Sequence, residues 1–509
     1  MARGPLVPPA ACLPPALAAG GLAAAALLLA GIAALFHRLA PEPYMDEPFH
    51  VPQTQRYCEG RWREWDPMIT TLPGLYLLGG AAGRLHSSLF GLLAGVLPPQ
   101  PCGTTVLRAV NAAAALACLP LFYAAAAAAD PSRSRRQLLL MTTAAFLFPL
   151  HFFFSFLYYT DVPSLAFTLA CHLAATRRSY KAAGLLGAAA VLMRQTNAVW
   201  VAFSLGDALL DRCLPEDAAP QRSNGKRGLR QRRGEGKGSS GSSSSGSGNA
   251  CGGEDNVLLQ LAHDMRQLAR QAWVLRRPLA GDLWPLAAVV VAFAAFVKVN
   301  GGIVVGDRAQ HTPVRHWAQP LYCLLYCTAA LAPVFWTPAA LAAAARRAAA
   351  AARVRPAAAA TALAGAAALA AAAVACGTLA HPYLLADNRH YTFYAWSRVL
   401  NAAPWARYAL VPAYLYSAAA LAGALGHRRR LWAAGLAGAA ALVLVPAHLL
   451  EPRYFTVPFY LVFLHMRTPS ARTLAAVALL WAAADAVTLY LFLARPFAWP
   501  DGTVARFIW

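Results

Sequence analysis

The sequence predicts an all-α protein that crosses a membrane several times. Of its 509 residues, 58% are hydrophobic and only 13% are charged, whereas a soluble domain usually has about 25% charged residues. Alanine-rich runs such as 357–380 and 431–449 have about the 20 residues that a helix needs to cross a bilayer. Alanine favours helix, and only helices and closed barrels satisfy the backbone in lipid.

The net charge of +22 comes largely from short basic loops between the apolar runs. A nucleic-acid-binding protein would gather lysine and arginine on one groove or arm, with aromatic residues between them. Basic loops between apolar runs are typical of the cytosolic side of membrane proteins. We therefore expect a lipid bilayer as partner and no nucleic acid. The loops are RSRR (133–136), RRSYK (177–181), RRAAAAARVR (346–355) and HRRR (427–430).

The first apolar run, residues 10–36, is longer than the roughly 7–15 residues of a signal-peptide core. It predicts a retained signal-anchor that makes up residues 1–36. A non-cytosolic loop then occupies 37–103, and its amphipathic part at 72–97 suits the membrane surface. Cys58 and Cys102 share this loop and can form a disulfide bond; the remaining cysteines lack zinc-binding spacing.

The first half of the membrane bundle covers residues 104–210. Its last apolar run, 182–210, allows one long helix or two short helices broken at MRQTN (193–197). The broken form keeps most later basic loops in the cytosol and removes Arg194 from lipid, so the positive-inside rule favours it. The other predicted spans are 104–128, 138–157 and 163–176.

Residues 211–282 differ in composition from both halves of the bundle. A basic cluster leads into a glycine- and serine-rich stretch that cannot bury a core, so we expect a disordered cytosolic insert with an amphipathic piece at 256–277. The second half of the bundle covers 283–509 and brings the total to about thirteen spans. Its predicted spans are 283–299, 318–338, 357–380, 405–426, 431–449, 454–467 and 472–494.

Six loops on the predicted non-cytosolic side combine carboxylates, cations, amides and aromatic rings. Each has an ordinary explanation alone: Asp46 and Glu47 suit a solvated turn, for example, and Asp161 a helix cap. Because all six loops lie on the same predicted side, they instead indicate one shared site. A site for a sugar phosphate requires a carboxylate that accepts a proton, cations that hold the phosphate and aromatic faces that contact the sugar or lipid. The loops are PYMDEPFH (43–50), YYTDVPS (158–164), RQTN (194–197), NGGIVVGDRAQH (300–311), LLADNRHYTFYAW (384–396) and EPRYF (451–455).

The same segments carry a family resemblance along nearly the whole chain, apart from residues 211–255. The chain resembles the endoplasmic-reticulum dolichyl-phosphate-glucose α-1,2-glucosyltransferases, which add the terminal glucose to the lipid-linked oligosaccharide of N-glycosylation. Position 48 departs from the pattern, because proline stands where we expect an aliphatic residue. The matching motifs are YMDEPFHVPQTQRYCEGRWREWDPMITTLPGLYLL (44–78), LMRQTN (192–197), VNGGIVVGDR (299–308), LLADNRHYTFYAWSRV (384–399), EPRYF (451–455) and WPDGTVARFIW (499–509).

The resemblance implies a GT-C helical bundle in the endoplasmic reticulum membrane, with its active site facing the lumen. It implies dolichyl-phosphate-glucose as donor and a diglucosylated lipid-linked oligosaccharide as acceptor. Converting a β-linked donor into an α-linked product requires one carboxylate as general base. Asp46 matches the family's position for that base, and its neighbour Glu47 is the alternative.

The remaining site residues follow from motif membership and loop side. The first candidates for binding the lipid phosphate are the cationic residues Arg308, Arg389, His390 and Arg453. Arg194 and His311 are second candidates for the same role. The side chains of Asp387, Asn388 and Tyr391 are candidates for hydrogen bonds to sugar hydroxyls. The remaining predicted substrate-binding residues are His50, Asp161, Asp307 and Glu451. We expect no metal and no cofactor, because the donor is a monophosphate.

Three alternatives remain open at this point. One is another dolichyl-phosphate-sugar transferase of the same architecture, using mannose or forming a different glucose linkage. Another is a transporter, although charged residues inside the predicted spans are few, mainly Lys298 and Asp485. The third is a membrane protein without catalytic activity.

Overall fold

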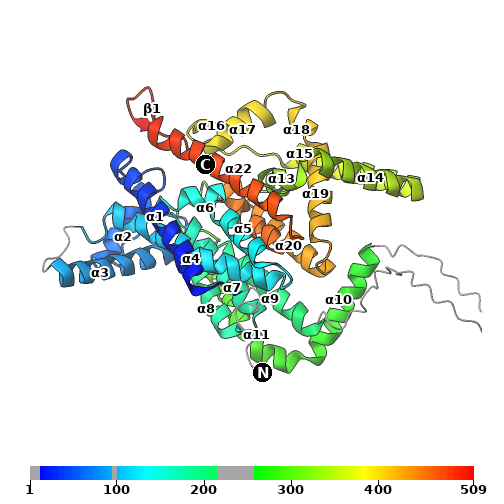
Figure 1. Cartoon of the computed structure of the whole chain (residues 1–509), viewed down its shortest axis with the longest axis horizontal. Coiled ribbons are helices and arrows are strands. Elements are labelled where there is room, and N and C mark those ends of the chain that lie inside the picture. The colour runs from blue at the N-terminus through cyan, green and yellow to red at the C-terminus, as the bar shows by residue number, and fades with distance from the viewer. Residues whose placement is uncertain (1–11, 95–99, 215–256) are drawn as a thin grey trace, which may run out of the picture.

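The structure is a computed structural model that describes residues 12–94, 100–214 and 257–509. Helices form nearly all of its regular structure, as predicted (Figure 1). The first half contains α1 (Pro15–Leu39), α2 (Glu47–Cys58), α3 (Gly74–Ala94), α4 (Thr104–Ala129), α5 (Arg135–Phe146), α6 (Pro149–Phe154), α7 (Asp161–Thr176), α8 (Tyr180–Met193) and α9 (Asn197–Cys213).

The second half begins after the part of the chain that is not described. Its helices are α10 (Val257–Val274), α11 (Arg276–Asn300), α12 (Gln319–Ala330), α13 (Ala332–Phe335), α14 (Pro338–Val354), α15 (Pro356–Gly377), α16 (Pro382–Ala386), α17 (Tyr391–Ala395), the π-helical turn η3 (Trp396–Leu400), α18 (Ala406–Ala409), α19 (Val411–Leu425), α20 (Arg430–Leu444), the 3₁₀ turn η4 (Pro452–Phe455), α21 (Thr456–His465) and α22 (Ala471–Ala494). Strands β1 (Phe497–Ala498) and β2 (Val504–Ala505) pair antiparallel.

Six of the described helices are long and apolar enough to cross a membrane. They establish a multi-pass membrane protein, although the sequence predicts about thirteen spans. The difference arises because other predicted spans, such as α7, α8 and α21, are helices of 16, 14 and 10 residues. At 1.5 Å per residue such helices are shorter than the roughly 30 Å hydrocarbon core. The six are α1, α4, α11, α15, the α18–α19 pair and α22.

Several predicted boundaries need correction. The predicted span 138–157 is two helices that break before Pro149, and 318–338 divides into α12 and α13. The basic stretch 346–355 lies largely in helix α14 rather than in a loop, because its alanine and arginine residues favour helix. In the segment 211–282, α9 extends to Cys213, and the amphipathic piece predicted at 256–277 lies in α10 and the start of α11. The disorder predicted for the remainder concerns residues 215–256, which lie outside the described residues.

The break predicted at 193–197 is confirmed, because α8 ends at Met193 and α9 begins at Asn197. Aromatic side chains fill the core where α6, α21 and α22 meet: the Phe148 and Phe459 rings stack at 4.1 Å, and Trp481 packs edge-on against Phe148. This packing joins the segment before α6 to α21 and α22.

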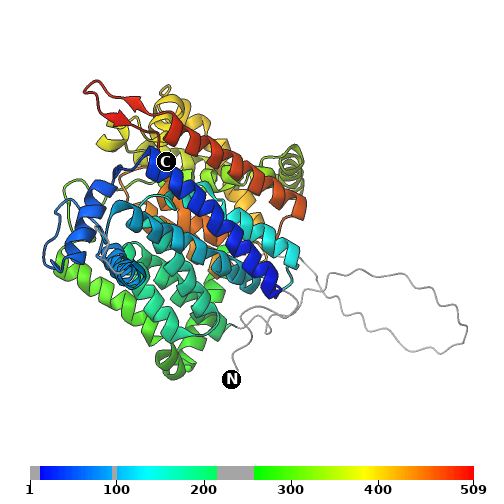
Figure 2. The ribbon, with the colours of Figure 1, turned by 60° about the vertical axis from the view of Figure 1, so that its left-hand side comes forward.

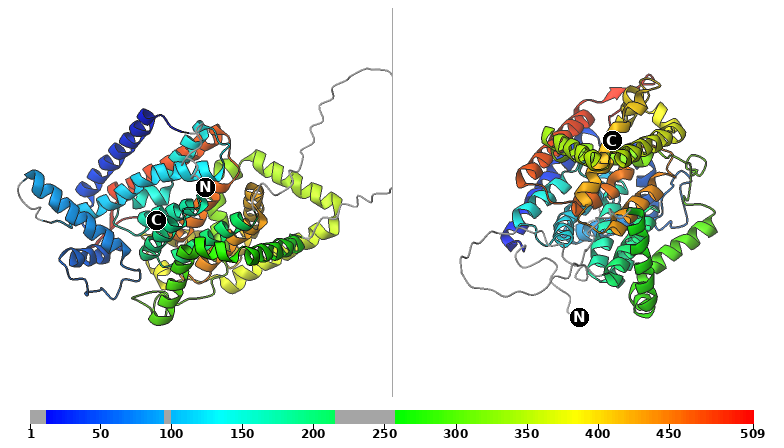
Figure 3. Two further views of the ribbon diagram at one scale, coloured as in Figure 1. Left: turned by 90° about the horizontal axis from the view of Figure 1, so that it is seen from below. Right: turned by 90° about the vertical axis from the view of Figure 1, so that its right-hand side faces the viewer.

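The arrangement of the outer helices defines two sides of the molecule. Helices α2 and α3 project on one side and α14 on the other (Figures 1 and 3). Helices α1 and α22 lie side by side, and the β1–β2 hairpin stands near the end of α1 (Figure 2). The hairpin therefore lies beside the connection from α1 to α2.

Candidate active site

A polar cavity of about 410 Å³ lies where the loops between the helices meet. Each of the six loops predicted to share one face contributes to its wall, so that prediction is confirmed. The predicted site residues that line the cavity are Asp46, His50, Arg194, Asp307, His311, Asp387, Arg389, His390, Glu451 and Arg453.

Asp46 stands at the start of α2 and faces the cavity, with 43% of its side chain exposed. The residue before it, Met45, has a φ of 60°, which is uncommon for a residue other than glycine and turns the chain sharply into the helix. The Asp46 N–H donates to the Tyr159 hydroxyl at 2.9 Å. Pro48 lies in the first turn of α2, where its missing N–H costs no helical hydrogen bond.

Glu47 has entirely different surroundings, because its side chain is fully buried. The Arg108 guanidinium donates to both carboxylate oxygens, at 2.9 and 2.6 Å. The backbone N–H groups of Tyr158 and Tyr44 donate to the same carboxylate at 2.7 and 3.0 Å. Arg108 also donates to the Ala40 carbonyl at 2.7 Å. Glu47 therefore fastens α2 to α4 and does not open onto the cavity.

Arg453 is surrounded by three carboxylates. Its Nε donates to Glu451 at 2.6 Å, and its Nη1 lies 3.4 Å from Asp46 and 3.5 Å from Asp161. Arg194 binds Asp161 at 2.9 Å. Asp161 thus sits between two arginines and does not cap its helix. Asp46 is the most exposed of these three carboxylates, so it is the one with most freedom to meet a substrate.

Asp46 is ionised at neutral pH because its neighbours outweigh its burial. Burial alone would raise the pKa of Asp46, but the positive charge of Arg453, with smaller effects of His50 and His390, lowers the pKa below the ordinary value of 3.8. Burial lowers the pKa of His50, against the opposing effect of Asp46. The cavity therefore presents an anionic oxygen beside a neutral imidazole, which suits proton acceptance.

The loop 387–391 forms another wall of the cavity. Arg389 and Asp387 make a bidentate pair at 2.8 and 2.7 Å, and His390 Nε2 lies 3.8 Å from the same carboxylate. Burial would raise the pKa of Asp387, but its bonds from Arg389 lower it. The Arg389 guanidinium also lies over the Trp499 ring at 4.6 Å. This loop can present a fixed cation to an anionic ligand.

The loop 305–307 is docked against the segment that precedes α3. The Asp307 N–H donates to the Pro67 carbonyl at 2.9 Å. A Cβ at Gly306 would lie 2.2 Å from that same carbonyl oxygen, so only glycine permits the approach. Asp307 itself has a φ of 39° and lies 3.5 Å from His311 Nδ1. The sharp turn places both side chains on the cavity wall.

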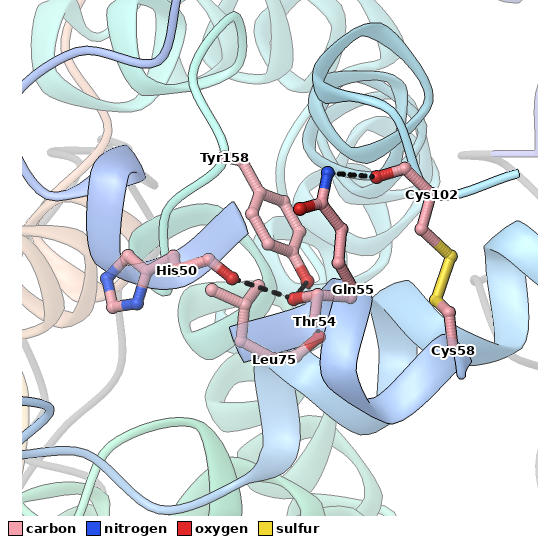
Figure 4. The surroundings of a disulfide bond; sticks show 7 residues. All are labelled: His50, Thr54, Gln55, Cys58, Leu75, Cys102 and Tyr158. Atoms are coloured by element: carbon pink, nitrogen blue, oxygen red, sulfur yellow. Dashed lines mark hydrogen bonds between the residues drawn. A yellow bond between two sulfur atoms is a disulfide. The ribbon is translucent and has the colours of Figure 1, made fainter. Parts of the chain in front are cut away.

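The far end of α2 is held by the Cys58–Cys102 disulfide, the pairing that the sequence allows (Figure 4). Nearby, the Thr54 hydroxyl donates to the His50 carbonyl at 2.9 Å, and the Tyr158 hydroxyl donates to the Leu75 carbonyl at 2.8 Å. Because Cys102 lies just before α4, both ends of α2 are fastened to the beginning of the same helix.

In the part of the chain that the structure describes, no group of three His, Cys, Asp or Glu side chains is placed to hold a metal ion. The polar groups of the cavity are instead paired as carboxylate and guanidinium. Their arrangement suits a substrate that carries both hydroxyls and an anionic group.

Comparison with known proteins identifies the family of the chain. The profile of the DIE2/ALG10 family matches residues 40–464. The chain belongs to this family. No solved structure matches it.

Relatives of this DIE2/ALG10 member are similar over almost their whole length. An Arabidopsis thaliana protein is 38% identical over 93% of this chain and 96% of its own. Mouse and human proteins are 33% and 31% identical, each over 93% of this chain and 94% of its own. All three carry the name Dol-P-Glc:Glc(2)Man(9)GlcNAc(2)-PP-Dol alpha-1,2-glucosyltransferase.

Five predicted site residues of this family member do not line the cavity. Arg308 donates to the Asn300 side chain at 2.7 Å, and Asn388 accepts from the Trp499 indole at 3.1 Å. The Tyr391 ring packs edge-on against Trp509. The other two are Glu47 and Asp161, which are bound by arginines.

Sequence reasoning missed Arg108 and Trp509. Arg108 lies within the predicted span 104–128, where an unpaired charge would cost several kcal/mol, and that cost was a signal that it had a carboxylate partner. Trp509 lines the cavity together with Ile508. The ending WPDGTVARFIW carried the family resemblance, but no local pattern indicates where such a segment packs.

Proposed function

We propose that this DIE2/ALG10 member is an inverting hexosyltransferase. It transfers glucose from dolichyl-phosphate-glucose to a diglucosylated lipid-linked oligosaccharide, with an α-1,2 linkage, in the last step of N-glycan precursor assembly. The names of its relatives describe this reaction. The structural observation that carries the proposal is the ionised, cavity-facing Asp46, which shares one cavity with the Arg389–His390 loop.

Asp46 is the proposed general base. Its carboxylate accepts the proton of the acceptor hydroxyl while that oxygen bonds to the anomeric carbon of the donor glucose. The bond from this carbon to the phosphate oxygen breaks, and its electron pair leaves with dolichyl phosphate. Attack from the side opposite the leaving group converts the β-linkage into an α-linkage. Glu47 cannot take this part while both of its oxygens accept bonds from Arg108.

Cationic side chains around the cavity are proposed to stabilise the leaving phosphate. Arg389 and His390 are the first candidates, because they line the cavity and are fixed by Asp387. Preorganised donors of this kind act most strongly where charge develops in the transition state. The dolichyl phosphate that leaves is a single phosphate group, to which N–H groups of Arg389 and His390 can donate, and the proposal names no cofactor.

We propose that the protein resides in the endoplasmic reticulum membrane with the cavity open to the lumen. The Cys58–Cys102 disulfide supports this orientation, because disulfides persist in oxidising compartments and are rare in the cytosol. The basic segments around Arg133 and Arg178 would then face the cytosol, as the positive-inside rule requires.

The test is transfer by the purified full-length protein in detergent. It is offered synthetic dolichyl-phosphate-glucose and a diglucosylated lipid-linked acceptor, and the product linkage is analysed. We expect an α-1,2-linked glucose, and no transfer from dolichyl-phosphate-mannose. Mannose transfer or another glucose linkage would identify a different transferase of the same architecture. An active parent whose Asp46→Asn variant is equally active would refute the proposed base.

A further inference from the structure

Residues 497–509, here named the C-terminal hairpin, leave α22 and turn back toward the end of α1 (Figure 2). Beyond strand β2 the chain continues into the candidate active site, where Ile508 and Trp509 line the cavity. The Ile508 side chain is 1% exposed, so this end of the chain is packed and not a loose tail.

One side of the hairpin is tied to the short connection that carries Asp46. The Tyr44 hydroxyl donates to the Arg506 carbonyl and accepts from the Arg506 N–H, both at 2.7 Å. The Arg506 guanidinium donates at 2.6 Å to the carbonyls of Leu39, at the end of α1, and Phe492, in α22. The hairpin therefore fixes the chain two residues before the proposed base.

The other side of the hairpin is tied to the Arg389 loop. The Ile508 N–H donates to the Arg389 carbonyl at 2.9 Å, and the Tyr391 N–H donates to the Ile508 carbonyl at 3.1 Å. The Trp509 carbonyl lies 2.9 Å from His390 Nδ1, and its indole packs against the Tyr391 ring at 5.0 Å. The hairpin thus touches the proposed phosphate-binding cations at consecutive residues.

We propose that the C-terminal hairpin is a positioning element of the transferase, which holds the Asp46 loop and the Arg389–His390 loop at the separation that the reaction requires. The inference rests on the proposed function, in which base and phosphate-binding groups act on opposite sides of one sugar carbon. A displacement of about 1 Å between such groups can lower a rate by about 100-fold. Tyr44, Trp509 and the Arg506 backbone are the positioning residues.

The experiment compares Tyr44→Phe, Trp509→Ala, Trp509→Phe and the double variant Tyr44→Phe/Trp509→Ala in the full chain. Each is assayed for kcat, donor KM and melting temperature in detergent. We expect each of the first two to lower kcat at least about tenfold and to lower the melting temperature as well, because both side chains are partly buried against the core. Trp509→Phe should recover most of the rate, since a ring still packs against Tyr391.

A control and the double variant separate positioning from general packing. Val504→Ala changes an exposed side chain on the same hairpin and should leave kcat unchanged. If the hairpin bridges the loops as one unit, the double variant should be about as slow as the slower single variant, because effects within one unit are not additive. Parental kcat in both single variants, or effects that multiply independently, would overturn the inference. An inactive parent would instead refute the proposed function.

Discussion

Asp46 and Glu47 show how neighbouring carboxylates acquire different roles from their surroundings. Asp46 faces the cavity beside Arg453, whereas Glu47 is buried and accepts four bonds from Arg108 and two backbone N–H groups. The motif MDEP contains both residues, so the sequence alone left them as alternatives for the base. What separates them is Arg108, which lies 61 positions from Glu47 in an apolar helix.

Replacing Asp46 should abolish chemistry and spare the fold. Asp46→Asn keeps the size of the side chain but removes its capacity to take a proton, so kcat should fall at least about 100-fold. Its melting temperature should stay at the parental value, because the side chain is partly exposed. Steady-state glucose transfer and thermal unfolding measure the two effects. A parental rate in the folded variant would contradict the assignment.

Replacing Glu47, in contrast, should lower the stability of the fold. Glu47→Gln leaves the buried Arg108 guanidinium without its counter-charge, and breaking a buried ion pair typically costs about 3–5 kcal/mol. We expect a clearly lower melting temperature in detergent. Glu59→Gln is the matched control, because Glu59 pairs with Arg61 on the exposed surface and its loss should leave the melting temperature unchanged.

The pH profile should report the influence of Arg453 on the base. Because the pKa of Asp46 is lowered, the parent should keep full kcat/KM as pH falls to about 5 and lose it only where the carboxylate becomes protonated. In Arg453→Met, burial still raises the pKa and the main opposing charge is gone. The acidic limb should therefore move to higher pH, whereas Arg453→Lys should move it less. An unshifted limb in Arg453→Met would show that another group controls this titration.

At the level of elements, the position of helix α2 is fixed because both of its ends are bonded to α4 or to the residue just before it. Glu47 binds Arg108 at one end, and Cys58 binds Cys102 at the other. A Cβ at Gly83 in α3 would lie 2.1 Å from the Cys102 sulfur. A glycine at this position is therefore needed to leave space for the disulfide. The orientation of Asp46 therefore depends on contacts at both ends of its helix.

Removing the disulfide should loosen this helix. Cys58→Ser/Cys102→Ser removes the link between two residues that are 44 positions apart in the sequence. Loss of a disulfide typically costs about 2–4 kcal/mol of stability. We expect a lower melting temperature and a lower kcat, with reducing agent producing the same effects in the parent. The control is Cys376→Ser, since Cys376 is a free, exposed cysteine. Parental stability in the double variant would contradict the two-ended attachment.

Elements were predictable from sequence where local chemistry decides them. The break between α8 and α9 follows from polar residues inside an apolar run, and the six polar loops indeed meet in one cavity. The helix over the basic stretch 346–355 does not follow from its charge, because arginine is common both in cytosolic loops and in alanine-rich helices. The placement of Trp509 beside His390 depends on contacts across more than 100 residues, for which a single sequence has no local signal.

For the whole molecule, the decisive property is which end of the bundle faces the lumen. Helix α4 has 26 residues, about 39 Å, so Cys102 before it and Ser132 after it lie at opposite ends. The natural chain has no Asn-x-Ser/Thr acceptor, which makes engineered acceptors unambiguous.

Glycan acceptors placed at the two ends should be modified at one end only. Arg61→Asn/Arg63→Thr creates an acceptor in the exposed turn after α2, and Ser132→Asn creates one in the basic loop after α4. Expressed in microsomes, the first protein should gain a glycosidase-sensitive mass and the second should not, because only the lumen has the modifying enzyme. Modification of the Ser132→Asn protein alone would invert the proposed topology.

The cavity begins only a few residues beyond α1, a helix long and apolar enough to cross the membrane, since α1 ends at Leu39 and Asp46 is among the wall residues. Two substrates that end in polyprenyl chains would reach such a site by lateral diffusion and not from the aqueous phase. Their effective concentration is then a mole fraction within the lipid or micelle. Adding detergent at constant bulk substrate should slow the reaction by surface dilution, even though every molar concentration in the tube except that of detergent is unchanged.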